Sequence, residues 1–234
     1  MKKDLTELAF ILDRSGSMSG LEQDTIGGYN SLIDKQKNEQ GEAIITTVLF
    51  DDKYEILHDR INLTDVMPIT SKEYFVRGST ALLDAIGTTV NNIKNAQLNI
   101  ADEERPEKVF IAIITDGMEN HSSEYSYSKV KAMIETQKEL GWEFMFIGAN
   151  IDAIGEAGKI GIAANRAVKY TADSRGTAVV YSAVSRSVMS MRNEKSVNED
   201  WKREIEEDFW VRNEKKSNEK NGGGILGKLK KLVK

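Results

Sequence analysis

Short runs of hydrophobic residues alternate along this chain with longer segments whose hydrophobic residues recur every three or four positions. Such runs are typical of strands buried on both faces, and the longer spacing is typical of helices that cover a sheet. The alternation therefore predicts a mainly parallel sheet with helices on both faces. We expect strands at 8–12, 43–50, 54–63, 109–114 and 144–147, a weaker edge strand at 167–170, and helices at 21–37, 82–93, 130–140 and 177–191.

Two of the predicted strands follow each other without a helix between them. Only Asp51, Asp52 and Lys53 separate 43–50 from 54–63, and so short a connection joins antiparallel strands. The predicted sheet is therefore mixed. The two prolines, Pro68 and Pro106, fall in predicted connections, where neither interrupts an element.

The length and composition favour one large α/β domain with an appendage, because 234 residues would be cramped as two full domains. Charges of both signs surround Trp201, Phe209 and Trp210, which indicates a helix that packs its aromatic residues on the domain. We expect the following units: the domain at 4–192, a charged and aromatic helical extension at 193–212, a polar linker ending in three glycines at 213–224, and a basic tail at 225–234.

The overall charge and the absence of cysteine narrow the class of protein. A net charge of −5 gives no general attraction to nucleic acid, so we expect no nucleic-acid partner. A chain without cysteine has no disulfide, thiolate metal site or thiol nucleophile, which fits a reducing compartment. Acidic residues interrupt the start of the chain, and no hydrophobic stretch reaches membrane-spanning length. We therefore expect a cytoplasmic protein.

The tail at 225–234 has its hydrophobic residues on one helical face and four lysines around the other. This basic amphipathic pattern fits an anionic membrane surface or a groove on a partner. Ten residues are only marginally helical alone, so a solvated end without a partner is the alternative.

Oxygen-bearing side chains follow the first predicted strand. Asp13, Ser15 and Ser17 alternate with other residues, and Gly16 permits the tight turn that lets their oxygens converge. Open α/β sheets place ligands where a strand's carboxyl end meets a helix. Such a cluster fits a hard cation, Mg²⁺ or Mn²⁺, with Ca²⁺ also compatible.

Two further loops offer oxygen at corresponding places. Thr80 ends the segment 78–80 before a predicted helix, and Asp116 lies in 115–117 after a predicted strand. Each loop alone is explained by an ordinary helix cap or turn. Three such loops at one sheet edge together predict a single metal site.

These motifs resemble the metal-ion-dependent adhesion site of von Willebrand factor A domains. The resemblance covers roughly Asp4 to Met191. Thr80, and not Ser79, occupies the threonine position of the motif. It is nearest to the cytoplasmic type of bacteria and phages. The resemblance implies a Rossmann-like three-layer αβα fold, mostly parallel with one antiparallel strand. It also implies a non-enzymatic module, whose metal binds an acidic residue of a protein partner. The implied metal residues are Asp13, Ser15, Ser17, Thr80 and Asp116.

Several other residues are expected to have lesser roles. Arg14 occupies a position that varies in the family. Glu119, in the segment 118–121, is expected at the rim, where it would disfavour an acidic partner. Asn150 or Asp152 is expected to cap a helix, and His58 and His121 to be surface residues and not metal ligands.

Two enzyme classes are the alternatives. Phosphohydrolases of the haloacid dehalogenase type also place an aspartate after the first strand, but they need a second aspartate two residues later, where this chain has Ser15. A dinucleotide-binding enzyme would need a Gly-x-Gly-x-x-Gly motif after the first strand, and Gly16 and Gly20 do not supply it.

Overall fold

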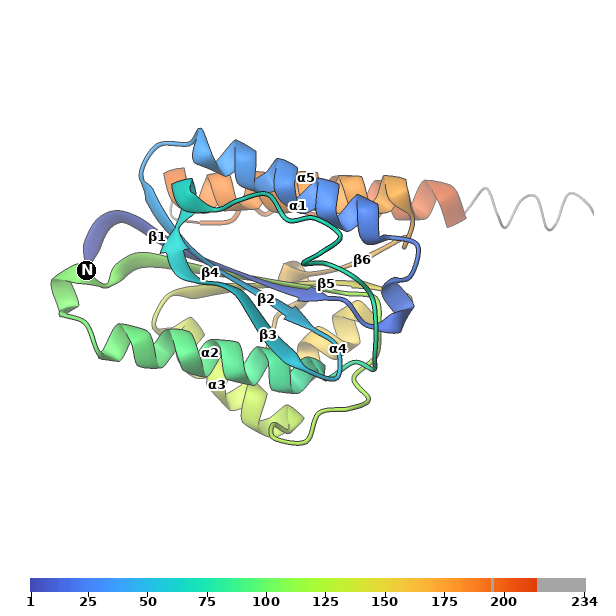
Figure 1. Ribbon diagram of the computed structural model, residues 1–234, viewed down its shortest axis with the longest axis horizontal. Coiled ribbons are helices and arrows are strands. Elements are labelled where there is room, and N and C mark those ends of the chain that lie inside the picture. Colours follow the sequence, from blue (N-terminus) through green and yellow to red (C-terminus); the bar gives the residue numbers. More distant parts are fainter. Residues whose placement is uncertain (195, 214–234) are drawn as a thin grey trace, which may run out of the picture.

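In this computed structural model, which describes residues 1–194 and 196–213, one six-stranded sheet crosses the molecule in the order β3-β2-β1-β4-β5-β6 (Figure 1). All neighbouring strands are parallel except the β2–β3 hairpin, so the predicted mixed sheet is confirmed. The hairpin puts β3 at one edge, and β6 forms the other. The strands are β1 (Lys2–Asp13), β2 (Glu42–Phe50), β3 (Tyr54–Asn62), β4 (Pro106–Thr115), β5 (Trp142–Ala149) and β6 (Ala167–Tyr170).

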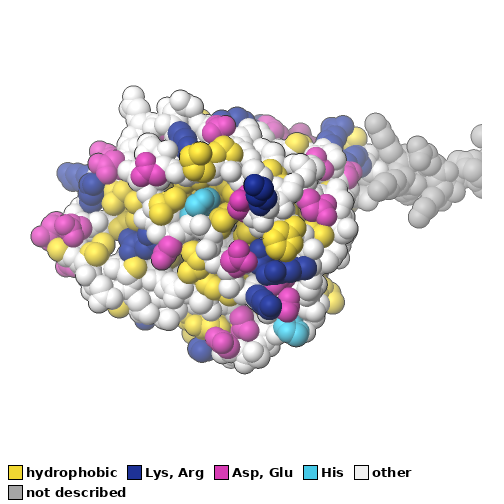
Figure 2. All heavy atoms as spheres, in the orientation of Figure 1, with side chains coloured by type: hydrophobic (Ala, Val, Ile, Leu, Met, Phe, Trp, Pro, Cys, Tyr) yellow, Lys and Arg dark blue, Asp and Glu magenta, His cyan; other side chains and the backbone are white. Residues whose placement is uncertain are grey.

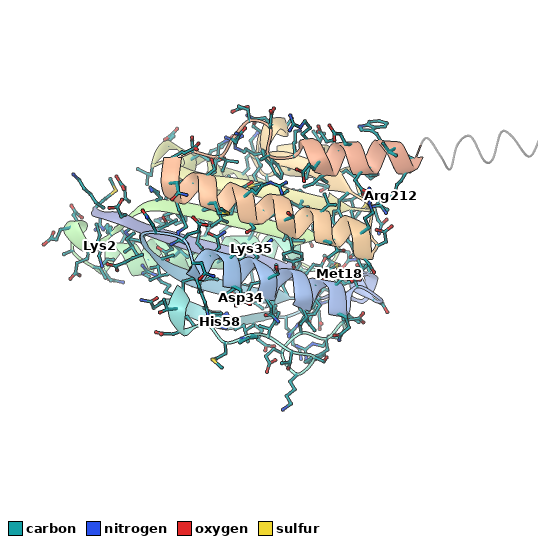
Figure 3. The ribbon with its side chains drawn as sticks, turned by 90° about the horizontal axis from the view of Figure 1, so that it is seen from above. Lys2, Met18, Asp34, Lys35, His58 and Arg212 are labelled. Carbon is teal, nitrogen blue, oxygen red and sulfur yellow. The ribbon has the colours of Figure 1, made fainter. Side chains whose placement is uncertain are left out.

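Helices cover both faces of the sheet, as the alternation predicts (Figure 1). One face carries α1 (Glu22–Lys37) and α5 (Ser174–Glu194), which lie side by side in Figure 3. The other face carries α2 (Leu82–Leu98), α3 (Tyr127–Glu139) and α4 (Ala153–Lys159). Each layer buries its own hydrophobic core against the sheet. The described residues also form short 3-10 turns at Gly16–Met18, Leu63–Asp65, Asp102–Glu104 and Ala164–Arg166.

The strand order reverses between β1 and β4. From β1 the chain passes through α1 to β2 on one side, and from β4 it passes through α3 to β5 on the other side. The two connections run over opposite faces of the sheet, and they diverge at the carboxyl ends of β1 and β4. Such a switch point is where open α/β sheets bind ligands.

The structure differs from the sequence predictions at Pro106 and in the extension after α5. Pro106 is not in a connection but is the first residue of β4, a position where its missing N–H does not interrupt a ladder. Of the aromatic residues in the extension, Trp201 is buried, whereas Trp210 is 63% exposed. The extension is helical over 203–213, so Asn213 belongs to the helix rather than to the predicted linker.

The rest of the predicted linker at 213–224 and the predicted tail at 225–234 lie outside the described residues. Within the part of the chain that is described, none of the helices combines the length and hydrophobicity that crossing a membrane requires.

Candidate metal centre

The first loop turns sharply at the end of the central strand β1. The Asp13 carboxylate accepts a hydrogen bond from the backbone N–H of Ser15 through Oδ1, at 2.7 Å. The 3-10 turn Gly16–Met18 then brings the Ser15 and Ser17 hydroxyl oxygens within 2.9 Å of each other. The alternating oxygen donors predicted from the sequence therefore do converge.

Asp116 joins this group because β4 lies beside β1 in the sheet. The register pairs Leu12 with Ile114, so the strands end together. Ser17 Oγ donates to Asp116 Oδ1 at 2.5 Å, and Thr115 Oγ1 donates to Asp13 Oδ2 at 2.6 Å. The two carboxylates thus lie on either side of the β1–β4 boundary.

Thr80 reaches the same place from the segment before α2. Its backbone N–H donates to Asn120 Oδ1 at 2.9 Å, and the backbone N–H of Asn120 donates to the Thr80 carbonyl at 3.0 Å. Gly117 lies between Thr80 and Ser17, since a Cβ added to it would be 2.8 Å from Thr80 Oγ1 and 3.1 Å from Ser17 Oγ. All five predicted metal residues therefore meet at one point.

The two carboxylates carry charge that no described basic side chain neutralises. Asp13 is 1% exposed and Asp116 3% exposed. Burial raises the pKa of Asp13, although the hydrogen bond from Thr115 lowers it. Burial also raises the pKa of Asp116 to about 6; the Ser17 hydrogen bond opposes this rise and the charge of Asp13 adds to it. Two buried acids this close together favour a bound cation or a proton.

The donor set suits a hard divalent cation. Asp116 Oδ2 is buried and accepts no hydrogen bond from the described residues, which leaves one carboxylate oxygen without a partner. The candidate site combines two carboxylates with three neutral hydroxyls. It differs from a cluster of three or more His, Asp or Glu side chains, and residues 1–194 and 196–213 contain no such cluster that could hold a metal. Gly117 leaves space beside the hydroxyls that any larger residue would fill. These residues fit a cation of the Mg²⁺ type, which prefers oxygen donors and keeps bound waters.

Some residues that shape this site were not singled out from the sequence. Thr115 holds Asp13, Asn120 holds both backbone groups of Thr80, and the Tyr74 hydroxyl donates to the Asp13 carbonyl at 2.5 Å. Thr115 lies inside the 115–117 motif and could have been recognised there. The roles of Asn120 and Tyr74 depend on contacts 40 and 61 residues away, which no local pattern reveals.

Glu119, which is expected at the rim, also holds the loop that follows Asp116. Its carboxylate accepts hydrogen bonds from the backbone N–H groups of Leu83, His121 and Ser122, at 2.9, 2.9 and 2.7 Å. The first of these lies in the first turn of α2, where a negative charge is stabilised by the helix. Glu119 therefore fastens the 117–122 loop to α2.

The other expectations have mixed outcomes. Asp152 caps α4 by accepting from the Gly155 N–H, at 3.1 Å, whereas Asn150 does not. His121 is exposed, as expected. His58 is half-buried and makes hydrogen bonds with Thr47 and Tyr29, so it is an internal residue of the β3 edge and not the surface residue that was expected.

Solved structures with a similar fold include von Willebrand factor type A domains. The proximal thread matrix protein 1 of the mussel byssus aligns over 79% of this chain and 46% of its own, with 20% identity and a TM-score of 0.52. A second structure of that protein, described as having a zinc-occupied MIDAS motif, aligns with 18% identity and a TM-score of 0.51. A von Willebrand factor type A protein from Catenulispora acidiphila aligns over 79% of this chain and 42% of its own, with 16% identity and a TM-score of 0.53.

These similarities show the fold. The chain has the three-layer α/β architecture of a von Willebrand factor A domain, as the sequence resemblance predicts. It spans about half the length of these neighbours. No protein-family model matches the sequence, and no curated protein matches it.

Proposed function

We propose that this protein is a binding module that holds a divalent cation at the β1–β4 switch point and uses it to bind an acidic side chain of a protein partner. The observation that carries the proposal is the pair of buried carboxylates, Asp13 and Asp116, surrounded by hydroxyls and not by basic side chains. The metal ligands would be Asp13, Ser15, Ser17, Thr80 and Asp116, and the cation Mg²⁺, Mn²⁺ or Ca²⁺.

The arrangement of exposure supports binding from outside. Ser17 and Gly16 are exposed, whereas Asp13 and Thr80 beneath them are buried, so the group opens to solvent on the Ser17 side. A cation held mostly by neutral oxygens keeps much of its positive charge and its exchangeable waters. A partner carboxylate that replaces one of these waters gains a strong electrostatic interaction.

Isothermal titration of the chelator-treated protein with MgCl₂ and MnCl₂ tests the metal site. Wild type should bind one ion, and Asp13→Ala should bind none, because it removes a carboxylate at the centre of the group. Asp152→Ala is the matched control, since Asp152 follows the carboxyl end of β5, at the same end of the sheet, but caps α4. Equal binding by Asp13→Ala and wild type would contradict the proposed site.

Capture of partners from the native cell tests the second half of the proposal. Partners that depend on the metal should be recovered in Mg²⁺, lost in chelator and lost with Asp13→Ala, yet retained with Asp152→Ala. A partner set that is the same in Mg²⁺ and in chelator would restrict the metal to a structural role.

A screen of phosphate esters with Mg²⁺ tests the phosphohydrolase alternative. The protein should turn over none of them, whereas turnover that is lost in Asp13→Asn would favour that alternative.

A further inference from the structure

A cluster of charged residues centred on the buried side chains of Arg14 and Asp51 adjoins the first loop. Arg14, between Asp13 and Ser15, has 0% exposure and is the largest of the fully buried side chains among the described residues. Its guanidinium pairs with Asp51 at 2.9 Å and with Glu55 at 2.6 Å. The family resemblance treats the Arg14 position as variable, and the sequence pattern assigns Asp51 only to a turn. Burial of an arginine beside a metal site calls for a more specific explanation.

Asp51 is the centre of this cluster. Its Oδ2 accepts from Arg14 Nε at 2.9 Å and from Arg77 Nε at 2.7 Å, and its Oδ1 accepts from the Lys53 N–H at 2.7 Å. Burial alone would raise the pKa of Asp51, but the hydrogen bonds from the Arg77 side chain, the Lys53 N–H and the Arg14 side chain, together with the charge of Arg14, outweigh it and lower the pKa. The carboxylate is therefore ionised at neutral pH and bridges two arginines.

The two arginines belong to different segments of the metal site. Arg14 lies in the loop of Asp13, Ser15 and Ser17, and Arg77 lies three residues before Thr80. Figure 1 shows that the chain between β3 and α2 crosses the β2–β3 edge and arrives at the sheet end where β1 stops. Figure 2, in the same orientation, shows basic, acidic and hydrophobic side chains side by side on the surface of this end of the molecule. Asp51 thus connects two of the segments that would hold the cation.

Backbone hydrogen bonds and an aromatic ring strengthen this connection. The Arg77 N–H donates to the Arg14 carbonyl at 2.9 Å, and the Ala81 N–H donates to the Asp51 carbonyl at 2.8 Å. The Phe75 ring lies 5.4 Å from the Arg14 guanidinium and 5.2 Å from that of Arg77, so it interacts with both cations. Thr80 is therefore held on its amino-terminal side at Arg77 and on its carboxyl-terminal side at Ala81.

We propose that Asp51, acting through Arg14 and Arg77, is a positioning residue that holds Thr80 at the distance from Ser15 and Ser17 that a small cation requires, and so favours Mg²⁺ over Ca²⁺. The inference rests on the metal site proposed above. Mg²⁺ requires near-octahedral geometry with oxygens at about 2.0–2.1 Å, whereas Ca²⁺ accepts six to eight oxygens at about 2.3–2.6 Å in flexible arrangements. A loop that is free to move away therefore weakens Mg²⁺ binding more than Ca²⁺ binding.

Calorimetric titration of the full chain with MgCl₂ and with CaCl₂ tests the proposal, and the measured quantity is the ratio of the two Kd values. Asp51→Asn places an amide against two guanidinium donors and should release Arg77. It should raise the Kd for Mg²⁺ by about 10- to 100-fold, as is usual when support behind a metal ligand is lost. The Kd for Ca²⁺ should rise less, so the preference for Mg²⁺ should fall.

Arg77→Gln is the second variant, because Asp51→Asn leaves the buried Arg14 poorly compensated and could prevent folding. The Arg77 side chain is 39% exposed, so its loss should leave the fold intact and still shift the Kd ratio in the same direction. Asp208→Asn is the matched control. Asp208 is 8% exposed and also binds two arginines, Arg175 at 2.7 Å and Arg212, but neither belongs to a metal loop.

The outcomes are distinguishable. If folded Arg77→Gln keeps the wild-type ratio of the two Kd values, even with both ions bound more weakly, the positioning role of Asp51 is overturned. A ratio that shifts equally in Asp208→Asn would also overturn it, because general destabilisation would then suffice. If wild type itself binds neither ion, the metal site fails first, and that result is separate from any difference among the variants.

Discussion

Gly117 lies beside Thr80 and Ser17 in the candidate metal centre. Its backbone conformation is open to other residues, but a Cβ would be 2.8 Å from Thr80 Oγ1 and 3.1 Å from Ser17 Oγ. Gly117→Ala should therefore leave the fold intact while filling space that a cation needs. We expect the Kd for Mg²⁺ to rise at least tenfold, which is about 1.4 kcal/mol of binding free energy.

Thermal unfolding without metal, together with titration of MgCl₂, separates these two effects of Gly117→Ala. Gly158→Ala is the control, because a Cβ at Gly158 in α4 meets no atom within 4 Å. That variant should bind Mg²⁺ as wild type does. Mg²⁺ binding by Gly117→Ala with the wild-type Kd would place the cation elsewhere.

Asp116 makes the stability of the metal-free protein depend on pH. Burial raises the pKa of Asp116 from 3.8 to about 6. At a pH between these two values, Asp116 is therefore protonated in the folded protein and ionised in the unfolded chain. This contribution to the free energy of unfolding is present at low pH and is lost as the pH rises through about 6. His58 acts in the opposite direction, since burial lowers its pKa and protonation then favours unfolding. The difference between wild type and Asp116→Asn isolates the aspartate.

Melting curves at pH 5.0 and 7.5, in chelator and in Mg²⁺, measure this effect. In chelator, the melting temperature of wild type minus that of Asp116→Asn should be larger at pH 5.0 than at pH 7.5. The increase in melting temperature caused by Mg²⁺ should shrink at pH 5.0, because protons compete with the cation for the carboxylates. An increase that is the same at both pH values would exclude Asp116 as a metal ligand.

At the scale of elements, two neighbouring glycines in α1 should respond in opposite ways to alanine. Gly27 is exposed and a Cβ there meets nothing within 4 Å, whereas a Cβ at Gly28 would be 2.3 Å from the Tyr181 ring of α5. Gly27→Ala should stabilise the protein by about 0.5–1 kcal/mol because alanine favours the helix. Gly28→Ala should destabilise it by about 1–3 kcal/mol because α1 and α5 would be overpacked.

Urea unfolding followed by far-UV circular dichroism measures both free energies. Tyr181 is 3% exposed, so its ring has little room to move away. Equal effects of the two alanines would mean that α1 and α5 are packed less closely than the structure shows.

The elements were predictable where the signal is local. The hydrophobic runs located all six strands, including the short β6, and Asp51–Lys53 identified the antiparallel hairpin. Element ends were less predictable: α2 continues to Leu98, beyond the last buried position of its hydrophobic pattern at Ile93. Pro106 was misplaced because the first residue of a strand tolerates proline.

For the candidate site too, local sequence patterns predicted only part of the arrangement. The three loops that supply its oxygens were predictable from strand ends and from the family resemblance. The residues that hold those loops were not, because Arg14, Asn120 and Tyr74 act through segments distant in sequence. Arginine between an aspartate and a serine carries no local sign of burial, and only the β2–β3 turn beside it provides the buried carboxylate.

At the scale of the whole molecule, the segment after α5 packs against the sheet. Trp201 is 6% exposed and donates through Nε1 to the Asn165 carbonyl at 2.8 Å, and Ile205 is 2% exposed in the same core as α1 and α5. Arg212 pairs with Asp173, before α5, so the helical end of this segment is also attached. Figure 3 shows Arg212 and Met18 at the same end of the molecule and Lys2 at the other. Residues 196–213 should therefore unfold together with the sheet.

Trp201→Ala tests this cooperativity. Removal of a buried tryptophan should lower the free energy of unfolding by about 3–5 kcal/mol, with wild type and variant each unfolding in one transition in urea. Trp210→Ala is the matched control, and because Trp210 is 63% exposed its effect should stay within about 0.5 kcal/mol. Both variants should bind Mg²⁺ with the wild-type Kd while folded, because neither tryptophan touches the loops of the candidate metal centre in the contacts described. A separate early transition, or a cost for Trp201→Ala below about 1 kcal/mol, would make this segment an appendage that folds independently of the sheet.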